Sequence, residues 1–194
     1  NSKGGSIEEF ANILYFILPN SSLAEIDSFF NEKIYSNFAN NNFQDSINNN
    51  ADEIHIFDNY ISYFDNNLYL YCFDIYSDKF VLNERKISNV NSFKFFNNSL
   101  IVKNNETITA YNLKNGKIFW SFEINKMLKK DTNIVNVLNI DNKIGIFLDN
   151  GDAIIIENNE IINLFNLKIK NINFIYSQDY FIFFSLKNGK TTIF

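Results

Sequence analysis

Short apolar runs rich in aromatic and β-branched residues alternate along the chain with stretches of Asn, Asp and Gly. Runs of this length and composition favour strands over helices, and the polar stretches favour turns. The most specific turn signals are Asn-Gly pairs at 115–116, 150–151 and 188–189, because these residues accept the positive φ angles of a type I′ hairpin. The pattern predicts an all-β chain of strands joined by hairpins.

The strand pattern occurs five times. Residues 10–27 align without a gap on residues 57–74, and further copies cover 96–112, 140–157 and 176–194. A polar marker recurs at Asn12, Asn59, Asn98, Asn142 and Asp179, with spacings of 47, 39, 44 and 37 residues. Such a period is typical of a propeller blade of four short strands, not of a helical solenoid.

Each copy predicts strands A, B and C, and the first four also predict a strand D. Strand A is exemplified by 53–57 and 93–96; B covers 13–18, 60–64, 100–103, 143–148 and 181–186; C covers 23–27, 69–74, 107–112, 153–157 and 191–194; D covers 33–38, 80–87, 117–124 and 160–165. These nineteen strands give repeats at approximately 6–38, 53–87, 92–124, 134–167 and 172–194, the last incomplete. The expected fold is a partial β-propeller of four to five antiparallel blades.

A partial propeller leaves two blade surfaces uncovered, because repeats bury their faces against neighbours. We therefore expect residues 1–194 to be one segment, the C-terminal part of a longer propeller. The alternatives are that two copies close a ring by self-association through the open blade ends, or that a partner covers those ends.

The third copy carries the most specific motif, Ala110-Tyr111-Asn112-Leu113-Lys114-Asn115-Gly116-Lys117-Ile118-Phe119-Trp120. It resembles the repeat of the pyrroloquinoline-quinone (PQQ) type β-propellers, in which Ala, Asp, Gly and Trp recur at this spacing. Ala110, Gly116 and Trp120 match, and Asn112 replaces the Asp. The resemblance implies that these four residues form a structural lock, with the Trp packed between neighbouring blades. An aromatic ring that leaves a tight turn can pack across such an interface.

The PQQ-type family has two branches. Quinoprotein dehydrogenases bind the quinone and calcium, commonly with a disulfide of adjacent cysteines, whereas other members, such as the propeller lipoprotein of the outer-membrane β-barrel assembly machinery, are docking platforms. This chain has one Cys and one Trp. The resemblance therefore favours a non-enzymatic docking scaffold without a cofactor, in the periplasm or at the outer membrane, with a membrane-embedded assembly factor as partner. The alternatives are a degenerate quinoprotein dehydrogenase fragment and the luminal domain of a sensor or receptor.

Composition excludes several other classes. One Cys cannot form an internal disulfide or a multi-Cys metal site, and one His cannot supply the usual His-based metal centre. A net charge of -5 argues against a nucleic-acid surface. No apolar run is long enough to predict a membrane-spanning helix.

Individual candidates for chemistry have simpler structural interpretations. His55 has no acid or nucleophile tied to it by sequence, and Cys72 lies in an apolar strand without a basic neighbour, so both are expected to be structural. Asp27, Asp74 and Glu157, with Asn112, recur at the end of strand C. We expect these side chains to bond to the backbone of the following turn, because calcium needs oxygens that converge on one point.

Two connections could contact a partner. Lys126, Lys129 and Lys130 form the densest basic stretch, suited to an acidic partner or lipid headgroups, although a solvated loop is the simpler interpretation. The connection 37–52 could be mobile or could form a short docking helix.

Overall fold

The structure is a computed structural model that describes residues 7–18, 23–35, 53–65, 67–124, 128, 131–178 and 181–193. Within these ranges nineteen strands form five antiparallel sheets, and no residue is helical. The all-β prediction is confirmed. The described part of the chain contains no helix of the length and hydropathy needed to cross a bilayer. Asp179 and the connection 37–52 lie outside the described residues.

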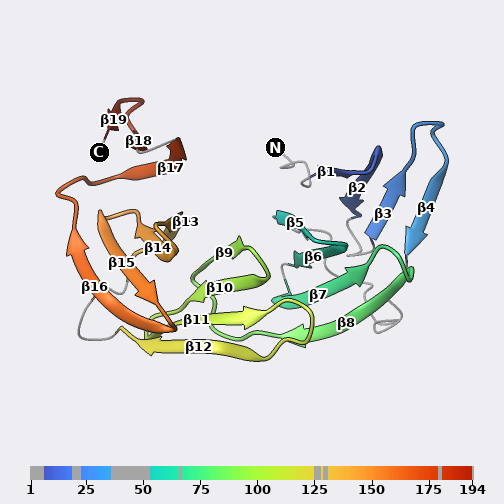
Figure 1. The fold of residues 1–194 in the computed structure, drawn as a ribbon, viewed down its shortest axis with the longest axis horizontal. Helices are drawn as coiled ribbons and strands as arrows, with labels where there is room; N and C mark the ends of the chain where they lie inside the picture. Colours follow the sequence, from blue (N-terminus) through green and yellow to red (C-terminus); the bar gives the residue numbers. More distant parts are fainter. Residues whose placement is uncertain are drawn as a thin grey trace. The chain divides into compact units, whose positions relative to one another are not determined.

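We number the five sheets blades 1 to 5 in chain order (Figure 1). Blade 1 holds β1 (Ile7–Phe10), β2 (Ile13–Ile17), β3 (Leu23–Ile26) and β4 (Glu32–Tyr35). Blade 2 holds β5 (Glu53–Phe57), β6 (Tyr60–Phe64), β7 (Tyr69–Asp74) and β8 (Lys79–Lys86). Blade 3 holds β9 (Ser92–Phe96), β10 (Ser99–Lys103), β11 (Thr107–Asn112) and β12 (Ile118–Glu123). Blade 4 holds β13 (Ile134–Ile140), β14 (Lys143–Leu148), β15 (Asp152–Glu157) and β16 (Glu160–Asn166), and blade 5 holds β17 (Ile172–Gln178), β18 (Phe181–Leu186) and β19 (Thr191–Ile193).

Every sheet is an up-and-down meander in which consecutive strands pair. Several predicted strands, including 60–64, 107–112 and 143–148, have the predicted bounds, and β12 is one residue shorter at each end. The three Asn-Gly pairs lie in turns, and Gly116, Gly151 and Gly189 have φ of 66°, 91° and 80°, but Asn115, Asn150 and Asn188 do not have positive φ. A type I′ turn needs positive φ at both central residues, so the type I′ prediction is wrong for these pairs. Consecutive positive φ angles occur instead at Ala11-Asn12, Asp141-Asn142 and Asn158-Asn159.

The chain divides into two compact units. Unit 1 is Asn1–Ser88 with Leu113–Gly116, and unit 2 is Asn89–Asn112 with Lys117–Phe194. Blades 1 and 2 of unit 1 share one core, which is aromatic: Tyr15, Tyr63, Tyr71 and Phe73 are buried together with aliphatic residues of both blades. The rings of Tyr63 and Tyr71 stack at 4.7 Å. Large flat rings cover much apolar area per residue, which suits a core between two sheets.

Unit 2 has two such cores. The first joins blades 3 and 4, with Ile101, Ile108 and Trp120 beside Ile146 and Ile154, and the second joins blades 4 and 5 around Phe147 and Phe184. The first strands of adjacent blades are also linked by hydrogen bonds. Ile134 N donates to Ser92 Oγ at 2.9 Å, and Asn136 Nδ2 donates to the carbonyl oxygen of Ile175. Blades 3, 4 and 5 therefore pack face to face.

Candidate docking surfaces

The motif residues of blade 3 lie in β11, in β12 and in the turn between them. Ala110 and Trp120 are directly paired across β11 and β12, and a register shift follows between Ala110 and Tyr111. Trp120 is 8% exposed in the core that joins blades 3 and 4, and its ring stacks on Phe122 at 5.1 Å. Asn112 N donates to Lys117 O at 2.8 Å, which closes the turn that contains Gly116. The PQQ-type resemblance implies that Trp120 packs between neighbouring blades. Its side chain lies in the core between blades 3 and 4.

The recurring carboxylates at the end of strand C cap the next turn in blades 1 and 2, as predicted. Asp27 Oδ1 accepts hydrogen bonds from Phe29 N at 2.8 Å and Asn31 N at 2.9 Å, and Oδ2 accepts one from Asn31 Nδ2 at 2.8 Å. These bonds from Asn31 hold the pKa of Asp27 below its ordinary value. Glu157, the equivalent residue of blade 4, forms an ion pair instead: its carboxylate lies 4.0 Å from Lys143 Nζ.

The equivalent turn of blade 2 has the same design. Asp74 Oδ1 accepts hydrogen bonds from Tyr76 N at 3.0 Å and Ser77 N at 3.4 Å, and from Asn59 Nδ2 at 2.9 Å. Desolvation by neighbouring groups raises the pKa of Asp74, but these hydrogen bonds outweigh it and leave the pKa below its ordinary value. Both carboxylates therefore act as fixed acceptors that order the backbone around them.

Exposed aromatic side chains stand on these two turns, and sequence analysis does not find them. Phe29 and Phe30 are 82% and 88% exposed on the turn between β3 and β4, and Tyr76 is 80% exposed on the turn between β7 and β8. We call these three residues the turn aromatics. Single exposed apolar residues are ordinary on protein surfaces, but adjacent, almost fully exposed Phe side chains on an ordered turn are not. The sequence feature that could have indicated them is the Phe29-Phe30 pair between the turn-forming residues Asp27 and Asn31.

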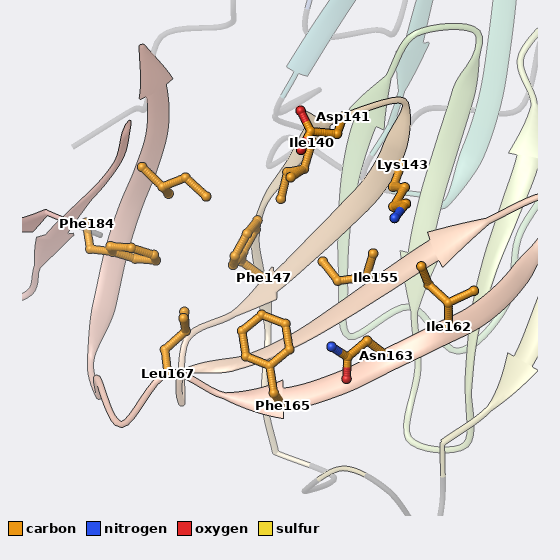
Figure 2. Close-up of a pocket in the computed structure, with 11 residues that line it drawn as sticks. Ile140, Asp141, Lys143, Phe147, Ile155, Ile162, Asn163, Phe165, Leu167 and Phe184 are labelled. Carbon is orange, nitrogen blue, oxygen red and sulfur yellow. The ribbon is translucent and has the colours of Figure 1, made fainter. Parts of the chain in front are cut away.

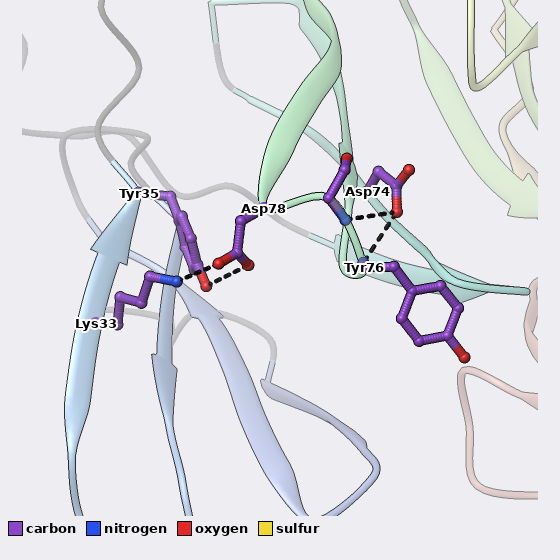
Figure 3. Close-up of polar contacts among 6 residues, drawn as sticks. Lys33, Tyr35, Asp74, Tyr76 and Asp78 are labelled. Carbon is purple, nitrogen blue, oxygen red and sulfur yellow. Dashed lines mark hydrogen bonds and ion pairs between the residues drawn. The ribbon is translucent and has the colours of Figure 1, made fainter.

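A polar contact ties the blade 2 turn to the last strand of blade 1 (Figure 3). Asp78, at the end of the blade 2 turn, accepts from Lys33 Nζ at 2.5 Å and from the Tyr35 hydroxyl at 3.1 Å, and both partners belong to β4. Lys33 Nζ also lies 4.6 Å from the centre of the Tyr35 ring. In the same view Tyr76 extends away from Asp78. The contact fixes β4 of blade 1 against the blade 2 turn and leaves the turn aromatics uncovered within the described residues.

Unit 2 exposes apolar side chains on a sheet face instead. Tyr176 and Phe183 are directly paired and stack at 4.7 Å, and the side chains in register with them on the same face include Phe174, Phe181 and Ile193. Phe174 is 52%, Phe181 54% and Ile193 58% exposed. We call this group the open face of blade 5. The opposite face carries Ile175 and Phe184, which are buried against blade 4.

An apolar pocket of about 340 Å³ lies between blades 4 and 5 (Figure 2). Phe147, Phe165 and Phe184 project into it, and its charged lining residues are Asp141 and Lys143. Phe147 and Phe184 meet edge to face, with ring centres 6.2 Å apart. A pocket of this composition suits apolar side chains rather than charged ligands.

The other sequence candidates have structural surroundings or lie outside the described ranges. Cys72 is fully buried, and burial raises its pKa to about 11, which favours the thiol form. His55 is half-buried, with its ring 5.9 Å from that of Phe57 and nearly parallel to it. In the described ranges, no group of three or more His, Cys, Asp or Glu could hold a metal ion. Lys126, Lys129 and Lys130 lie outside the described residues, so their role stays a prediction.

No protein-family model matches the chain, and no curated protein sequence matches it. Among solved structures the chain is similar to BamB from Moraxella catarrhalis, with a TM-score of 0.71 and 13% identity over 98% of this chain and 58% of BamB. It is also similar to BBS1N, solved in complex with ARL6DN (TM-score 0.62, 11% identity, 97% of this chain and 63% of that one). A third similar structure is PorZ of Porphyromonas gingivalis (TM-score 0.58, 14% identity, 98% of this chain and 27% of that one).

These similarities establish the fold. The chain is an all-β partial propeller with antiparallel blades, as the repeats predict. It spans less than two thirds of the length of each of these three structures. At these identities the likeness concerns architecture and carries no residue roles.

Proposed function

We propose that this chain is a non-enzymatic scaffold that docks another protein through the turn aromatics of unit 1. The observation that carries the proposal is the near-complete exposure of Phe29, Phe30 and Tyr76 on turns that Asp27 and Asp74 hold in one conformation. Protein interfaces concentrate their binding energy in a few aromatic side chains that enter pockets of the partner. Side chains on an ordered turn lose little conformational entropy on binding. Phe29, Phe30 and Tyr76 are therefore both aromatic and already ordered for contact with a partner.

The finer part of the proposal concerns the partner and the compartment. The PQQ-type resemblance of residues 110–120 and the BamB-like fold both support a role in outer-membrane protein assembly, in the periplasm or at the outer membrane. The partner would then be the membrane-embedded assembly factor. BBS1N, a structure of similar fold, was solved in complex with ARL6DN, and PorZ is an essential bacterial surface component of the type-IX secretion system. Both support a propeller used as a docking module.

Photo-cross-linking tests the docking function in the native host. A benzoyl-phenylalanine at position 29 or 76 should capture a protein that the same group at Val81 does not capture; Val81 is 45% exposed on β8 of the same unit. The captured protein, once purified, should bind the chain, and Phe29→Ser should weaken binding about tenfold while Val81→Ser leaves it unchanged. Equal binding by the two variants would overturn the docking surface.

A cofactor titration tests the alternative enzyme class. Pyrroloquinoline quinone with calcium is titrated into the full-length protein, and absorbance and heat are followed. We expect no saturable signal. Saturable binding with defined stoichiometry would contradict the non-enzymatic proposal and favour a degenerate quinoprotein.

A further inference from the structure

We propose that the apolar pocket between blades 4 and 5 binds a tryptophan side chain that a partner protein presents. The pocket belongs to unit 2 and does not involve the turn aromatics, so this inference shares with the function proposed above only that the partner is a protein. Three observations carry it. The pocket lies at the position that a buried tryptophan fills in the neighbouring blade, its walls are aromatic, and its polar lining can accept an indole N–H.

Asn163 of blade 4 occupies the position that Trp120 occupies in blade 3. Trp120 of β12 pairs with Ala110 of β11 next to a register shift. Asn163 of β16 pairs with Ile155 of β15 next to the same kind of shift. Trp120 lies in the core that joins blades 3 and 4, and Asn163 lines the pocket between blades 4 and 5. Both side chains therefore project from the same register position toward the next blade.

The tryptophan fills its interface between blades, and the asparagine does not. Trp120 is 8% exposed and packs in one core with Ile146 and Ile154 of blade 4. At Asn163 the structure instead has the pocket of about 340 Å³ (Figure 2). An apolar cavity of about 150 Å³ is enough to hold benzene, so this pocket has room for an indole ring. The interface between blades 4 and 5 therefore lacks a ring that the neighbouring interface contains.

Phenylalanine rings form the walls of the pocket. Phe147 and Phe184 meet edge to face, and both also belong to the buried core that joins blades 4 and 5. Phe165 projects into the same space and is 38% exposed. Aromatic rings favour edge-to-face or offset contacts with a further ring, which stabilise beyond the area that they bury. A tryptophan in the pocket would extend an interface that is already packed, with little ordering of its walls.

The polar lining favours indole over a purely apolar ring. A buried indole N–H needs a hydrogen-bond acceptor, and phenylalanine has no such group. Asn163 and Asp141 line the pocket and carry acceptor oxygens in their side chains. The pocket therefore suits a tryptophan side chain better than a phenylalanine or leucine side chain.

The source of the ring cannot be residues 1–194 themselves. Their single tryptophan is Trp120, which is buried in the core between blades 3 and 4. A second copy of the chain would have its Trp120 buried in the same way, so it has no tryptophan to offer either. A partner protein with an exposed tryptophan meets the requirement. A free indole-like molecule has the same ring chemistry, and the experiment separates the two sources.

Fluorine NMR of 5-fluoroindole with the full-length protein tests the pocket. The protein should shift and broaden the probe signal saturably, and N-acetyl-tryptophanamide should displace the probe at concentrations severalfold lower than N-acetyl-phenylalaninamide does. Phe165→Ser should weaken probe binding about tenfold, because it removes one wall. Absence of saturable probe binding, or equal displacement by the two amides, would overturn the tryptophan site.

Two tryptophan substitutions provide a matched pair. Asn163→Trp supplies the ring from this chain, so it should abolish probe binding and raise the thermal unfolding midpoint. Leu164→Trp is the control, since Leu164 pairs with Ile154 of the other core and its side chain lies on the opposite face of the sheet. It should leave probe binding unchanged. Equal binding by Asn163→Trp and the unmodified protein would place the probe elsewhere and overturn the assignment.

A random peptide display library separates a protein-borne ring from a free one. Peptides selected on the protein and counter-selected on Asn163→Trp should be enriched in tryptophan, and Phe165→Ser should bind them about tenfold more weakly. Probe binding without tryptophan enrichment would overturn the protein partner and assign the pocket to a small aromatic ligand. Phe29→Ser should bind probe and peptides as the unmodified protein does. A failure of docking at the turn aromatics is therefore distinguishable from a failure at this pocket.

Discussion

The two units expose apolar side chains in different ways. In unit 1 the most exposed rings, Phe29 and Phe30, stand on a turn, whereas in unit 2 Phe174, Phe181 and Ile193 share one face of a sheet. The open face of blade 5 has the same character as the faces that are buried between blades 3, 4 and 5. Another blade, from this chain or a second copy, would cover such a face.

Turn tips require a different explanation. The turns after the third strand of blades 2 and 3 contact the last strand of the blade before them, since Asp78 accepts hydrogen bonds from Lys33 and Tyr35 of β4 and Gly116 lies against the Arg85 side chain of β8. A blade placed before blade 1 would contact the turn of Phe29 and Phe30 in the same way. Tyr76 is 80% exposed although blade 1 is present, so its exposure indicates an interaction more strongly than equal exposure on an unpaired blade face.

Each unit contains one natural reporter of its own core. Cys72, the single cysteine, is fully buried in blade 2 of unit 1, and Trp120, the single tryptophan, is buried in unit 2. Thiol labelling follows the opening of unit 1, because the reagent needs an exposed thiolate. Tryptophan fluorescence follows unit 2. The two signals allow the effect of each substitution below to be assigned to a unit.

The largest effect is expected at Gly151, in unit 2. A Cβ there would clash with the backbone carbonyl of Ile169, and φ is 91°, so Gly151→Ala adds a clash to backbone strain. We expect the free energy of unfolding to fall by about 3 kcal/mol. Gly189→Ala is the matched control, since φ is 80° but nothing lies within 4 Å of the added Cβ, and it should cost about 1 kcal/mol. Denaturant unfolding followed by Trp120 fluorescence measures both, and equal losses would contradict the clash.

The next prediction is that two copies of the chain associate through the open face of blade 5 and that a charge on this face disrupts their association. Phe181→Lys places a charge beside the Tyr176 and Phe183 stack and should weaken self-association about tenfold, about 1.4 kcal/mol, in sedimentation measurements. Phe29→Lys, a similar change on the unit 1 turn, should leave the association constant unchanged. A comparable loss in both variants would remove the distinction between the two surfaces.

Much of the fold is predictable because it follows from local pattern. Alternating apolar runs separated by turn residues set the strands, and β6, β11 and β14 begin and end at the predicted residues. The Asn-Gly pairs lie in turns but do not form the type I′ geometry predicted for them. The division of blades 1 to 5 between two units was not predicted, since it depends on contacts between distant residues. The burial of Lys103 was not predicted either, because it also depends on distant contacts. Desolvation lowers the pKa of Lys103, although the charges of Asp149 and Asp131 act in the opposite direction.

The candidate site was partly predictable. Asp27 and Asp74 were assigned to the turns by chemistry alone, and their hydrogen bonds confirm it. The turn aromatics were missed because an apolar residue next to a strand is ordinarily interpreted as core. The positive φ of Phe30 also lies outside what residue preferences predict, because Asn31, the next residue, suits that conformation better. Only the structure shows which residue adopts it.

A smaller effect of opposite sign is expected at Phe30. Phe30→Asn relieves the left-handed strain and loses no buried contact, because the side chain is 88% exposed, so the free energy of unfolding should rise by about 1 kcal/mol. Phe29→Asn, whose position has no positive φ, should change it little. Urea unfolding followed by Cys72 labelling compares the two. A gain at both positions would indicate a general benefit from removing exposed Phe, without strain at Phe30.

The smallest effect is the pH dependence of the blade 1 turn. The pKa of Asp27 is lowered in the folded state, so its hydrogen bonds contribute stability above the ordinary value of 3.8 and lose it as pH falls through the folded-state pKa. The amide NMR signals of Phe29 and Asn31 should therefore titrate with a midpoint below 3.8, and Asp27→Asn should abolish that transition. Because the turn orders Phe29 and Phe30, binding of the cross-linked partner protein at the turn aromatics should weaken over the same range, while association through the open face of blade 5 should not change. A midpoint at or above 3.8 would mean that the Asp27 carboxylate does not hold the turn, and the rigidity assigned to the turn aromatics would have to come from the two backbone bonds, from Phe30 N to Asp27 O and from Asp27 N to Asn31 O.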